Sequence, residues 1–407
     1  MKAINFLILF AIIFSFLTKT CAVSTTKIDV VRAKETLVDT DTAVIEEFLA
    51  AAFDEFYAKT DFSDIAVLRT TIISRSTSEL ESGQIQYAPR FLTAAEKQIA
   101  QTLEKSSKLP DGLHKQLLTM NLMILINDLG NLEISKIALN YTQTPDVMVR
   151  YWAVNCLTNS NILRQLNTTG SAETTRLAGQ FVQNLQTVVK NENSGDILIL
   201  AAQFAGSLKS PAANDLLIQI AKKREELYLN WQVNDEMVEC SVLKSLSDRI
   251  QIDPDNAKIT AKEFAILYSL VVQRYALGID TLPAVNISNL VSVIVQSEKY
   301  ITRFISDWPG SLKRAVEKGG GAGLLAEHDT LFGSSAAAGR LPTAAGFDYG
   351  KNANGSIMTT PPQLPKPPAK AVAETDLPQD ANKQETKKPS VKTPPQTQDA
   401  NKQEIKK

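Results

Sequence analysis

The chain has 407 residues, of which 44% are hydrophobic and 21% are charged, so most of it can bury a core. Its 43 basic and 44 acidic residues leave a formal net charge of −1, which gives no electrostatic footprint for nucleic acid, and we expect no nucleic-acid partner. Three cysteines and two histidines are too few for a disulfide framework or an ordinary zinc site.

Residues 1–22 predict a signal peptide. Lys2 supplies a positive charge, and the apolar run Phe6–Leu17 follows it, interrupted by Ser15. A run of about a dozen residues has the length of a signal-peptide core and is too short for a transmembrane helix, which needs about 20. We expect cleavage after Ala22 and a secreted, periplasmic or extracellular location.

The alternative is a lipid anchor on Cys21, because a cysteine just after such a core can accept a lipid. Lys19 stands where the lipoprotein pattern has a small neutral residue, so the lipid anchor is the less favoured of the two. No second apolar run of 18 or more residues follows in the sequence, and we therefore expect no integral membrane segment after cleavage.

Residues 23–110 are expected to form an N-terminal helical region, which can also be interpreted as degenerate repeats. Apolar residues recur with the helical period from Ile45 to Phe56 and again from Ile65 to Ile72. Thr93 and Glu96 have the spacing of a capping box, which predicts that a third helix begins at Thr93.

Residues 111–303 repeat a pattern of helix, short turn and helix, and short turns make successive helices antiparallel neighbours. Many of these helices are apolar on more than one side, so each must lie between others. We therefore expect an all-α fold, an α-solenoid of antiparallel helical pairs. The predicted helices are Leu113–Leu129, Leu132–Tyr141, Val147–Leu157, Ala172–Val189, Asp196–Leu208, Ala213–Leu229, Glu236–Ile250 and Ala257–Tyr275.

Two segments of this region resemble HEAT-like repeats of the armadillo type. DVMVRYWAV (146–154) is similar to their inner-helix signature, in which an aspartate opens the helix and a Val-Arg pair is followed by alanine three residues on. AAQFAGSLKSPAA (201–213) is similar to the phycobilin-lyase type of this repeat. Asp146 is placed to cap its helix, and the resemblance implies that Arg150 forms hydrogen bonds between neighbouring repeats.

Cysteine chemistry is not expected. Cys156 lies on a continuous apolar stripe with Val149 and Trp152, and a thiol in apolar surroundings is inert because its charged form is disfavoured. Cys240 also lies in an apolar helical pattern. The sequence leaves open whether Cys156 and Cys240 are bridged, although two buried free thiols are the simpler interpretation.

The two histidines give no clear signal of metal or hydrolase chemistry. His114 and His328 have no ligand spacing with the cysteines that would predict zinc. The dipeptide His328-Asp329 resembles that of a metal phosphohydrolase family, but the other histidines of that family are missing. EKGGGAG (317–323) could suggest a phosphate loop; it lacks the following Lys-Ser/Thr, so we expect a flexible loop.

A calcium loop is the remaining alternative. Asn256, Thr260 and Glu263 can be placed at ligand positions of such a loop, but the aspartates nearby then fall out of register. We expect instead a Pro-Asp turn in which Asp255 or Asn256 caps the next helix. The sequence thus predicts no catalytic residue, no metal site and no cofactor.

Four Asn-x-Ser/Thr sequons occur, at Asn140, Asn167, Asn286 and Asn354. In an exported eukaryotic protein, Asn167 and Asn354 would be the candidate glycosylation sites, since both lie in predicted loops. Chance alone produces several sequons in a chain of this length.

The carboxy-terminal part has a different composition. Residues 304–356 are rich in glycine and alanine and are expected to be irregular. Residues 357–407 are rich in proline and lysine and contain no aromatic residue, so they cannot bury enough apolar surface to offset their ordering entropy and are expected to be disordered. Within them, PPQLPKPP (361–368) favours polyproline II geometry.

These features predict an exported, non-enzymatic binding or scaffolding protein that uses a helical-repeat surface to bind a protein partner. The alternative is a structural cell-envelope protein attached through its Pro/Lys-rich tail. Nine lysines and six acidic residues from Pro361 onward give the tail a net charge of +3, which suits a weak contact with an anionic envelope polymer.

Overall fold

The computed structural model describes residues 23–79, 85–168, 170–319 and 321–368. They belong to one compact unit that extends to Pro368. Within the described ranges the structure is helical apart from two isolated bridges, which confirms the all-α prediction there. None of these helices is both long and apolar enough to cross a bilayer. The predicted signal peptide and the tail beyond Pro368 lie outside the described residues.

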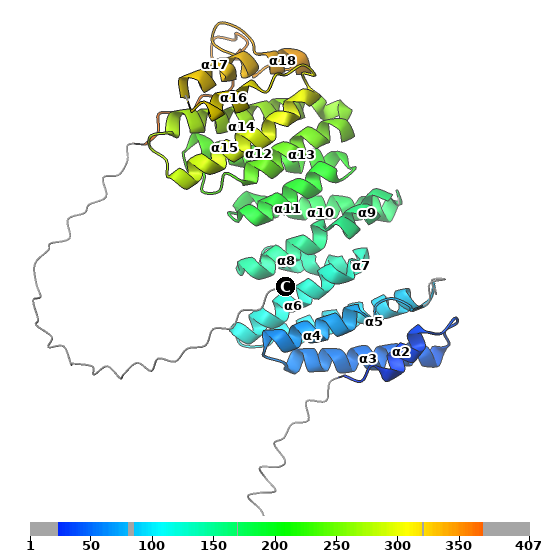
Figure 1. Cartoon of the computed structure of the whole chain (residues 1–407). Coiled ribbons are helices and arrows are strands. Elements are labelled where there is room, and N and C mark those ends of the chain that lie inside the picture. Colours follow the sequence, from blue (N-terminus) through cyan, green and yellow to red (C-terminus); the bar gives the residue numbers. More distant parts are fainter. Residues whose placement is uncertain (1–22, 80–84, 169, 320, 369–407) are drawn as a thin grey trace, which may run out of the picture. The chain divides into compact units, whose positions relative to one another are not determined.

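Helices make up most of the described chain (Figure 1). Their bounds are α2 (Thr26–Arg32), α3 (Asp39–Ala58), α4 (Phe62–Ile73), α5 (Tyr87–Ser107), α6 (Leu113–Leu129), α7 (Leu132–Ser135), α8 (Val147–Thr158), α9 (Ser160–Thr168), α10 (Ala172–Asn191), α11 (Gly195–Ser207), α12 (Pro211–Leu229), α13 (Val238–Ile252), α14 (Ala257–Gly278), α15 (Ala284–Glu298), α16 (Ser311–Glu317), α17 (Gly321–Phe332) and α18 (Arg340–Ala345). Three 3-10 helices join them, η1 (Lys136–Tyr141), η2 (Pro254–Asn256) and η3 (Lys299–Arg303).

The helices predicted between residues 113 and 275 are all present. α6 runs from Leu113 to Leu129 as predicted, and the predicted helix over 132–141 is a turn of α-helix, α7, followed by the 3-10 helix η1. The periodic pattern predicts these helices correctly because their apolar residues face neighbouring helices. That packing stabilises a helix more than its intrinsic propensity does.

Caps fix several of the helix ends. The Asp146 carboxylate accepts hydrogen bonds from the backbone N–H groups of Met148 (2.9 Å) and Val149 (3.1 Å), which confirms the predicted cap of α8. Gly130 ends α6 with φ of 55°, a left-handed conformation that favours glycine. The chain therefore turns sharply into α7 and on to η1, whose end faces the start of α8.

Most of the helices pack against a sequence neighbour, and several also pack against the next helix but one or two. α4 lies against α6, α6 against α8, α8 against α11, and α11 against α13; in parallel, α10 lies against α12 and α12 against α14 (Figure 1). The predicted N-terminal helical region continues this pattern through contacts of α3 with α5 and of α5 with α6, within the same compact unit.

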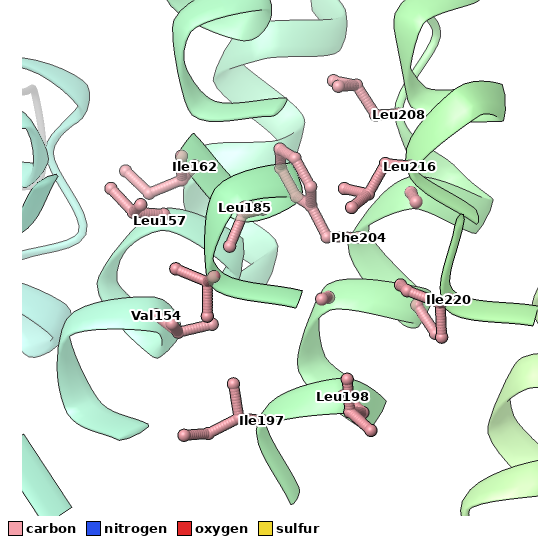
Figure 2. Packing of buried hydrophobic residues seen from close by; sticks show 14 of the residues in the cluster. Val154, Leu157, Ile162, Leu185, Ile197, Leu198, Phe204, Leu208, Leu216 and Ile220 are labelled. Atoms are coloured by element: carbon pink, nitrogen blue, oxygen red, sulfur yellow. The ribbon is translucent and has the colours of Figure 1, made fainter. Parts of the chain in front are cut away.

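The core is continuous between α8, α11 and α12, where side chains including Val154, Phe204 and Leu216 are buried (Figure 2). α11 also approaches α13 closely at Gly206. A Cβ atom there would lie 2.9 Å from Cα of Ser245, so only glycine permits this packing distance.

Two sequence predictions are wrong in this part of the structure. Residues 304–356 are not uniformly irregular, because they contain α16, α17 and α18; Leu312 and Leu324 are fully buried and hold two of these short helices to the fold. The third predicted N-terminal helix, α5, begins at Tyr87 and not at Thr93. The hydroxyl of Thr93 donates to a backbone carbonyl one turn earlier, and α5 starts sooner because Tyr87 is fully buried.

The prediction of a disordered tail fails for the first twelve residues of that segment. Residues 357–368, here called the C-terminal strap, are ordered and pack against α14, so the prediction of disorder from residue 357 is wrong for them. The side-chain amide of Gln273 donates to the carbonyl of Pro362 (3.0 Å) and accepts from the N–H of Leu364 (2.8 Å), and Leu364 is 8% exposed. A proline-rich segment loses little entropy on docking, since its backbone is already restricted.

Candidate functional site

A surface groove of about 440 Å³ lies between the starts of α6 and α8. Three segments line it: the first turn of α6 with the two residues before it, the end of η1, and the turn that leads into α8. The lining residues are Asp111, Gly112, Leu113, Lys115, Gln116, Thr119, Tyr141, Thr144, Pro145, Asp146 and Val149.

Exposed apolar side chains occur at one lining residue of this groove and at two residues next to another in the sequence. Leu113, in the first turn of α6, is 69% exposed, although it lines the groove. Val147 and Met148, which follow the lining residue Asp146, are also exposed. Apolar side chains that gather around a concavity and face solvent mark a binding surface more often than scattered ones do.

The groove also has a few polar groups. Lys115 pairs with Asp111 (2.9 Å) at one side, while the carboxylate of Asp146 is occupied in capping α8. Burial raises the pKa of Tyr141, so its hydroxyl stays protonated. An apolar floor with fixed polar groups at its edge is the arrangement found in most ligand pockets.

A second hollow of about 250 Å³ continues from the first, because Thr144 and Pro145 line both. Arg150 and Glu192 line it as well. The two hollows together extend from α6 past the start of α8 to the end of α10, so the candidate site spans several helices.

Arg150 joins the helices beneath this second hollow. Its guanidinium donates to both carboxylate oxygens of Glu192 (2.6 and 3.2 Å) and to the carbonyl of Thr144 (2.7 Å). Burial acts against the charge of Glu192, but Arg150 and the backbone N–H groups of Ser194 and Asn193 outweigh it and lower the pKa of Glu192. These hydrogen bonds connect α8 to Glu192, the residue that follows α10.

Cys156 and Cys240 are free thiols and do not form a bridge. Cys156 is fully buried and donates to the carbonyl of Met123 (3.0 Å), and burial raises its pKa well above the usual range. Cys240 is only partly buried, and burial raises its pKa to about 11. Both thiols therefore stay protonated near neutral pH, as predicted for Cys156.

The two histidines lie in different parts of the fold. His114 contacts the carbonyl of Tyr57 through Nε2 (3.2 Å) and so joins α6 to the end of α3. His328 is buried between Ser269, whose Oγ lies 2.7 Å from Nε2, and Asp329, whose Oδ1 lies 3.0 Å from Nδ1. Burial lowers the pKa of His328.

Ser269, His328 and Asp329 have the hydrogen-bond order of a hydrolase triad, but their setting is structural. Ser269 is fully buried inside α14, and its oxygen accepts a hydrogen bond from Gln273 (2.9 Å). Gln273 in turn holds Pro362 of the C-terminal strap. The chain of hydrogen bonds therefore connects α17 to the strap through α14, with the serine oxygen already engaged on both sides.

The residues of the calcium alternative do not converge. Thr260 donates to Asn214 (2.9 Å), and the amide of Asn256 donates to Asp253 (3.0 Å). Asn256 occupies the N-cap position of α14, as expected, but its side chain makes no capping hydrogen bond. Within the described ranges, no group of three or more His, Cys, Asp or Glu residues is placed to hold a metal ion.

Glu263 belongs instead to a buried carboxyl pair with Glu225 of α12. Glu263 is 5% exposed, and among the described residues its Oε2 and the Oε1 of Glu225 have no hydrogen-bond partner. Burial, and then the Glu263 carboxylate, raise the pKa of Glu225 to about 9, although the charges of Lys222 and Lys262 act in the opposite direction. The folded chain therefore keeps a proton on this pair.

We expect the free energy of unfolding to fall as the pH rises. The unfolded chain loses the Glu225 proton near pH 4.3, whereas the folded chain keeps it until about pH 9. Between these values the loss approaches about 1.4 kcal/mol per pH unit. Glu225→Gln should flatten this dependence and stabilise the chain at pH 9, which urea unfolding from pH 5 to pH 9 measures. Glu226→Gln, at the exposed neighbouring position, is the control, and equal slopes in both variants would contradict the expectation.

One of the two candidate glycosylation sites is placed differently from the prediction, while Asn354 lies in a turn as predicted. Asn167 lies in α9 and not in a loop; its amide donates to the carbonyl of Ser207 (3.1 Å) and accepts from the N–H of Lys209 (2.8 Å). The amide of Asn286 is held by Glu236. The other two sequon asparagines, Asn140 and Asn354, are exposed.

Sequence reasoning missed the groove because its residues come from separate segments. Leu113, Tyr141 and Pro145 approach one another only when α6, η1 and α8 pack together. The one local signal is the apolar Leu113 directly after the Pro-Asp-Gly turn, at a helix start where polar residues are common. No family model, no curated protein and no solved structure matches the chain.

Proposed function

We propose that the chain is an exported, non-enzymatic binding protein that captures an apolar segment of a partner protein in the groove between α6 and α8. The observation that carries the proposal is the groove itself, about 440 Å³ in volume, with the lining residue Leu113 exposed to solvent. This volume lies in the range of about 300–1,000 Å³ that is usual for ligand pockets. An exposed apolar rim favours a protein chain as the ligand, since its side chains can cover it.

The proposal includes a scaffold of stacked helical pairs, an α-solenoid of the HEAT-like type. The contacts of α6 with α8, of α8 with α11 and of α11 with α13 support it, as does the ion pair of Arg150 with Glu192. Stacked pairs present an extended surface, and in such proteins that surface serves binding. The apolar run Phe6–Leu17 supports export.

Leu113→Lys tests the groove. A charged side chain at the rim opposes burial of an apolar partner segment, so we expect about tenfold weaker capture, which corresponds to about 1.4 kcal/mol. The tagged full-length protein is crosslinked in its native host, and quantitative mass spectrometry compares the captured proteins. The unfolding midpoint should not change, because Leu113 is exposed.

Val285→Lys is the matched control, since Val285 on α15 is 65% exposed and does not line the groove. Partners that survive Val285→Lys and are lost with Leu113→Lys support the proposal. Equal losses in both variants would refute it. Truncation after Pro368 distinguishes partner capture from the alternative role, attachment to the cell envelope through the tail. If the truncated chain still captured its partner but were no longer retained at the envelope, the tail would be shown to attach the protein.

A further inference from the structure

Val23, the first described residue, is held at its backbone nitrogen by a carboxylate. The nitrogen donates to Oε2 of Glu55 on α3 (3.1 Å), and the half-buried side chain of Val23 packs against the core. The Glu55 side chain is only 19% exposed. A partly buried carboxylate is thus aimed at one particular main-chain nitrogen.

Negative charges outnumber positive charges around this contact. Lys59 Nζ lies 3.6 Å from Glu55 Oε1 and 3.2 Å from Asp64 Oδ2, so one positive charge serves two carboxylates. The neighbouring Arg75 is paired with Asp29 (3.1 Å). One further positive charge at the Val23 nitrogen would balance the group, and a charged donor forms a stronger hydrogen bond to a carboxylate than a neutral amide does.

There is also room for a chain end beside this contact. A hollow of about 380 Å³ is lined by Val23 together with Glu55, Lys59 and Asp64. An ammonium group has more donors than an amide N–H, and a hollow beside the nitrogen leaves space for water to reach the additional ones.

We propose that hydrolysis of the Ala22–Val23 peptide bond creates an α-ammonium group on Val23 and that Glu55 binds it as an ion pair. One water molecule is consumed by an endopeptidase of the signal-peptidase class: the Ala22 carbonyl becomes a carboxylate, and the Val23 nitrogen becomes an ammonium group. The cleavage rests on the export that is part of the proposed function. The docking of the new terminus is a further property of α3, which ties the processed end to the fold.

Recombinant chains with defined ends test the docking without any need for export. One preparation of residues 23–407 begins with a free amine on Val23, and the other carries an acetyl group on the same nitrogen. At pH 6.5 we expect the free-amine form to unfold about 2–4 °C higher, the shift that about 1 kcal/mol produces in a large chain. The difference should disappear above about pH 9.5, since α-amino groups ordinarily titrate near pH 8.

Glu55→Gln should abolish the difference at every pH, and Glu47→Gln, an exposed position on α3, should preserve it. Equal midpoints of the two forms at pH 6.5, or a difference that survives Glu55→Gln, would overturn the docking. Mass spectrometry of the exported protein tests the cut: a first residue Val23 supports it, and any other first residue overturns it. A failure of export contradicts the proposed function, while the recombinant comparison still decides the docking.

Discussion

Replacing Arg224 by methionine should lower the free energy of unfolding by about 3–5 kcal/mol, because it leaves Glu239 buried without its partner. The side chains of Arg224 on α12 and Glu239 on α13 are 5% and 0% exposed. The guanidinium donates to both oxygens of that carboxylate and to the carbonyl of Asp235 (2.7 Å). Urea unfolding of the full chain measures the loss.

The control is Arg176→Met, which removes an ion pair with Glu173 at the surface and should leave the free energy of unfolding close to the wild-type value. A second variant separates the pair's own contribution from the cost of an orphaned charge. Arg224→Met combined with Glu239→Leu should recover most of the stability, since two apolar side chains of similar volume can replace a buried ion pair. If Arg224→Met alone lowered the free energy of unfolding no more than Arg176→Met does, that result would contradict the structural role of the Arg224–Glu239 pair.

Truncation of the chain after Ser356 should cost about 3–5 kcal/mol of stability, whereas truncation after Pro368 should cost little. The shorter chain loses the C-terminal strap. It exposes the pocket filled by Leu364, a side chain whose burial contributes about 2 kcal/mol. It also removes the two hydrogen bonds that the buried amide of Gln273 makes with the strap, to Pro362 and from Leu364, at about 1–3 kcal/mol, while its bond to Ser269 remains.

Thermal unfolding of the two truncated chains beside the full-length protein measures this difference. Leu364→Ala in the full-length chain provides the graded test and should lose about 2–3 kcal/mol. Pro368→Ala, at an exposed position of the same strap, should change little. Equal midpoints for chains ending at Ser356 and at Pro368 would show that the strap does not stabilise α14.

The helical architecture could be predicted because its signals are local. The apolar period placed α6 to the residue, and an aspartate before an apolar run predicted the Asp146 cap. The buried stripe that contains Cys156 follows from the same period. Such features depend on residues one or two turns apart, so periodicity and capping chemistry are enough.

The features that were missed depend on contacts between distant segments. The sequence predicted a hydrogen-bonding role for Arg150 but could not predict its partner, Glu192. The two residues are 42 positions apart in the sequence, and they meet only because α8 packs beside the end of α10. The C-terminal strap has the composition of a disordered segment. What orders it is Gln273 on α14 and the indole of Trp231, which donates to the carbonyl of Pro365 (3.1 Å). Composition alone carries no information about such a receiving surface.

The candidate groove could not be predicted from the sequence, for the same reason. Glycine- and alanine-rich residues between 304 and 356 gave too weak a period to predict α16 to α18, and a groove formed by two helix starts has no sequence signature of its own. A surface that residues of separate helices form together becomes visible only in the fold.

Photocrosslinking from the groove tests the central claim most directly. A benzophenone side chain is placed at position 113 of the full-length protein in its native host, and in a second preparation at position 285 on α15. The proposed function predicts a discrete covalent adduct with a partner polypeptide from position 113, mapped by mass spectrometry to an apolar segment, and no such adduct from position 285. No adduct at position 113, or the same adducts from both positions, would contradict it.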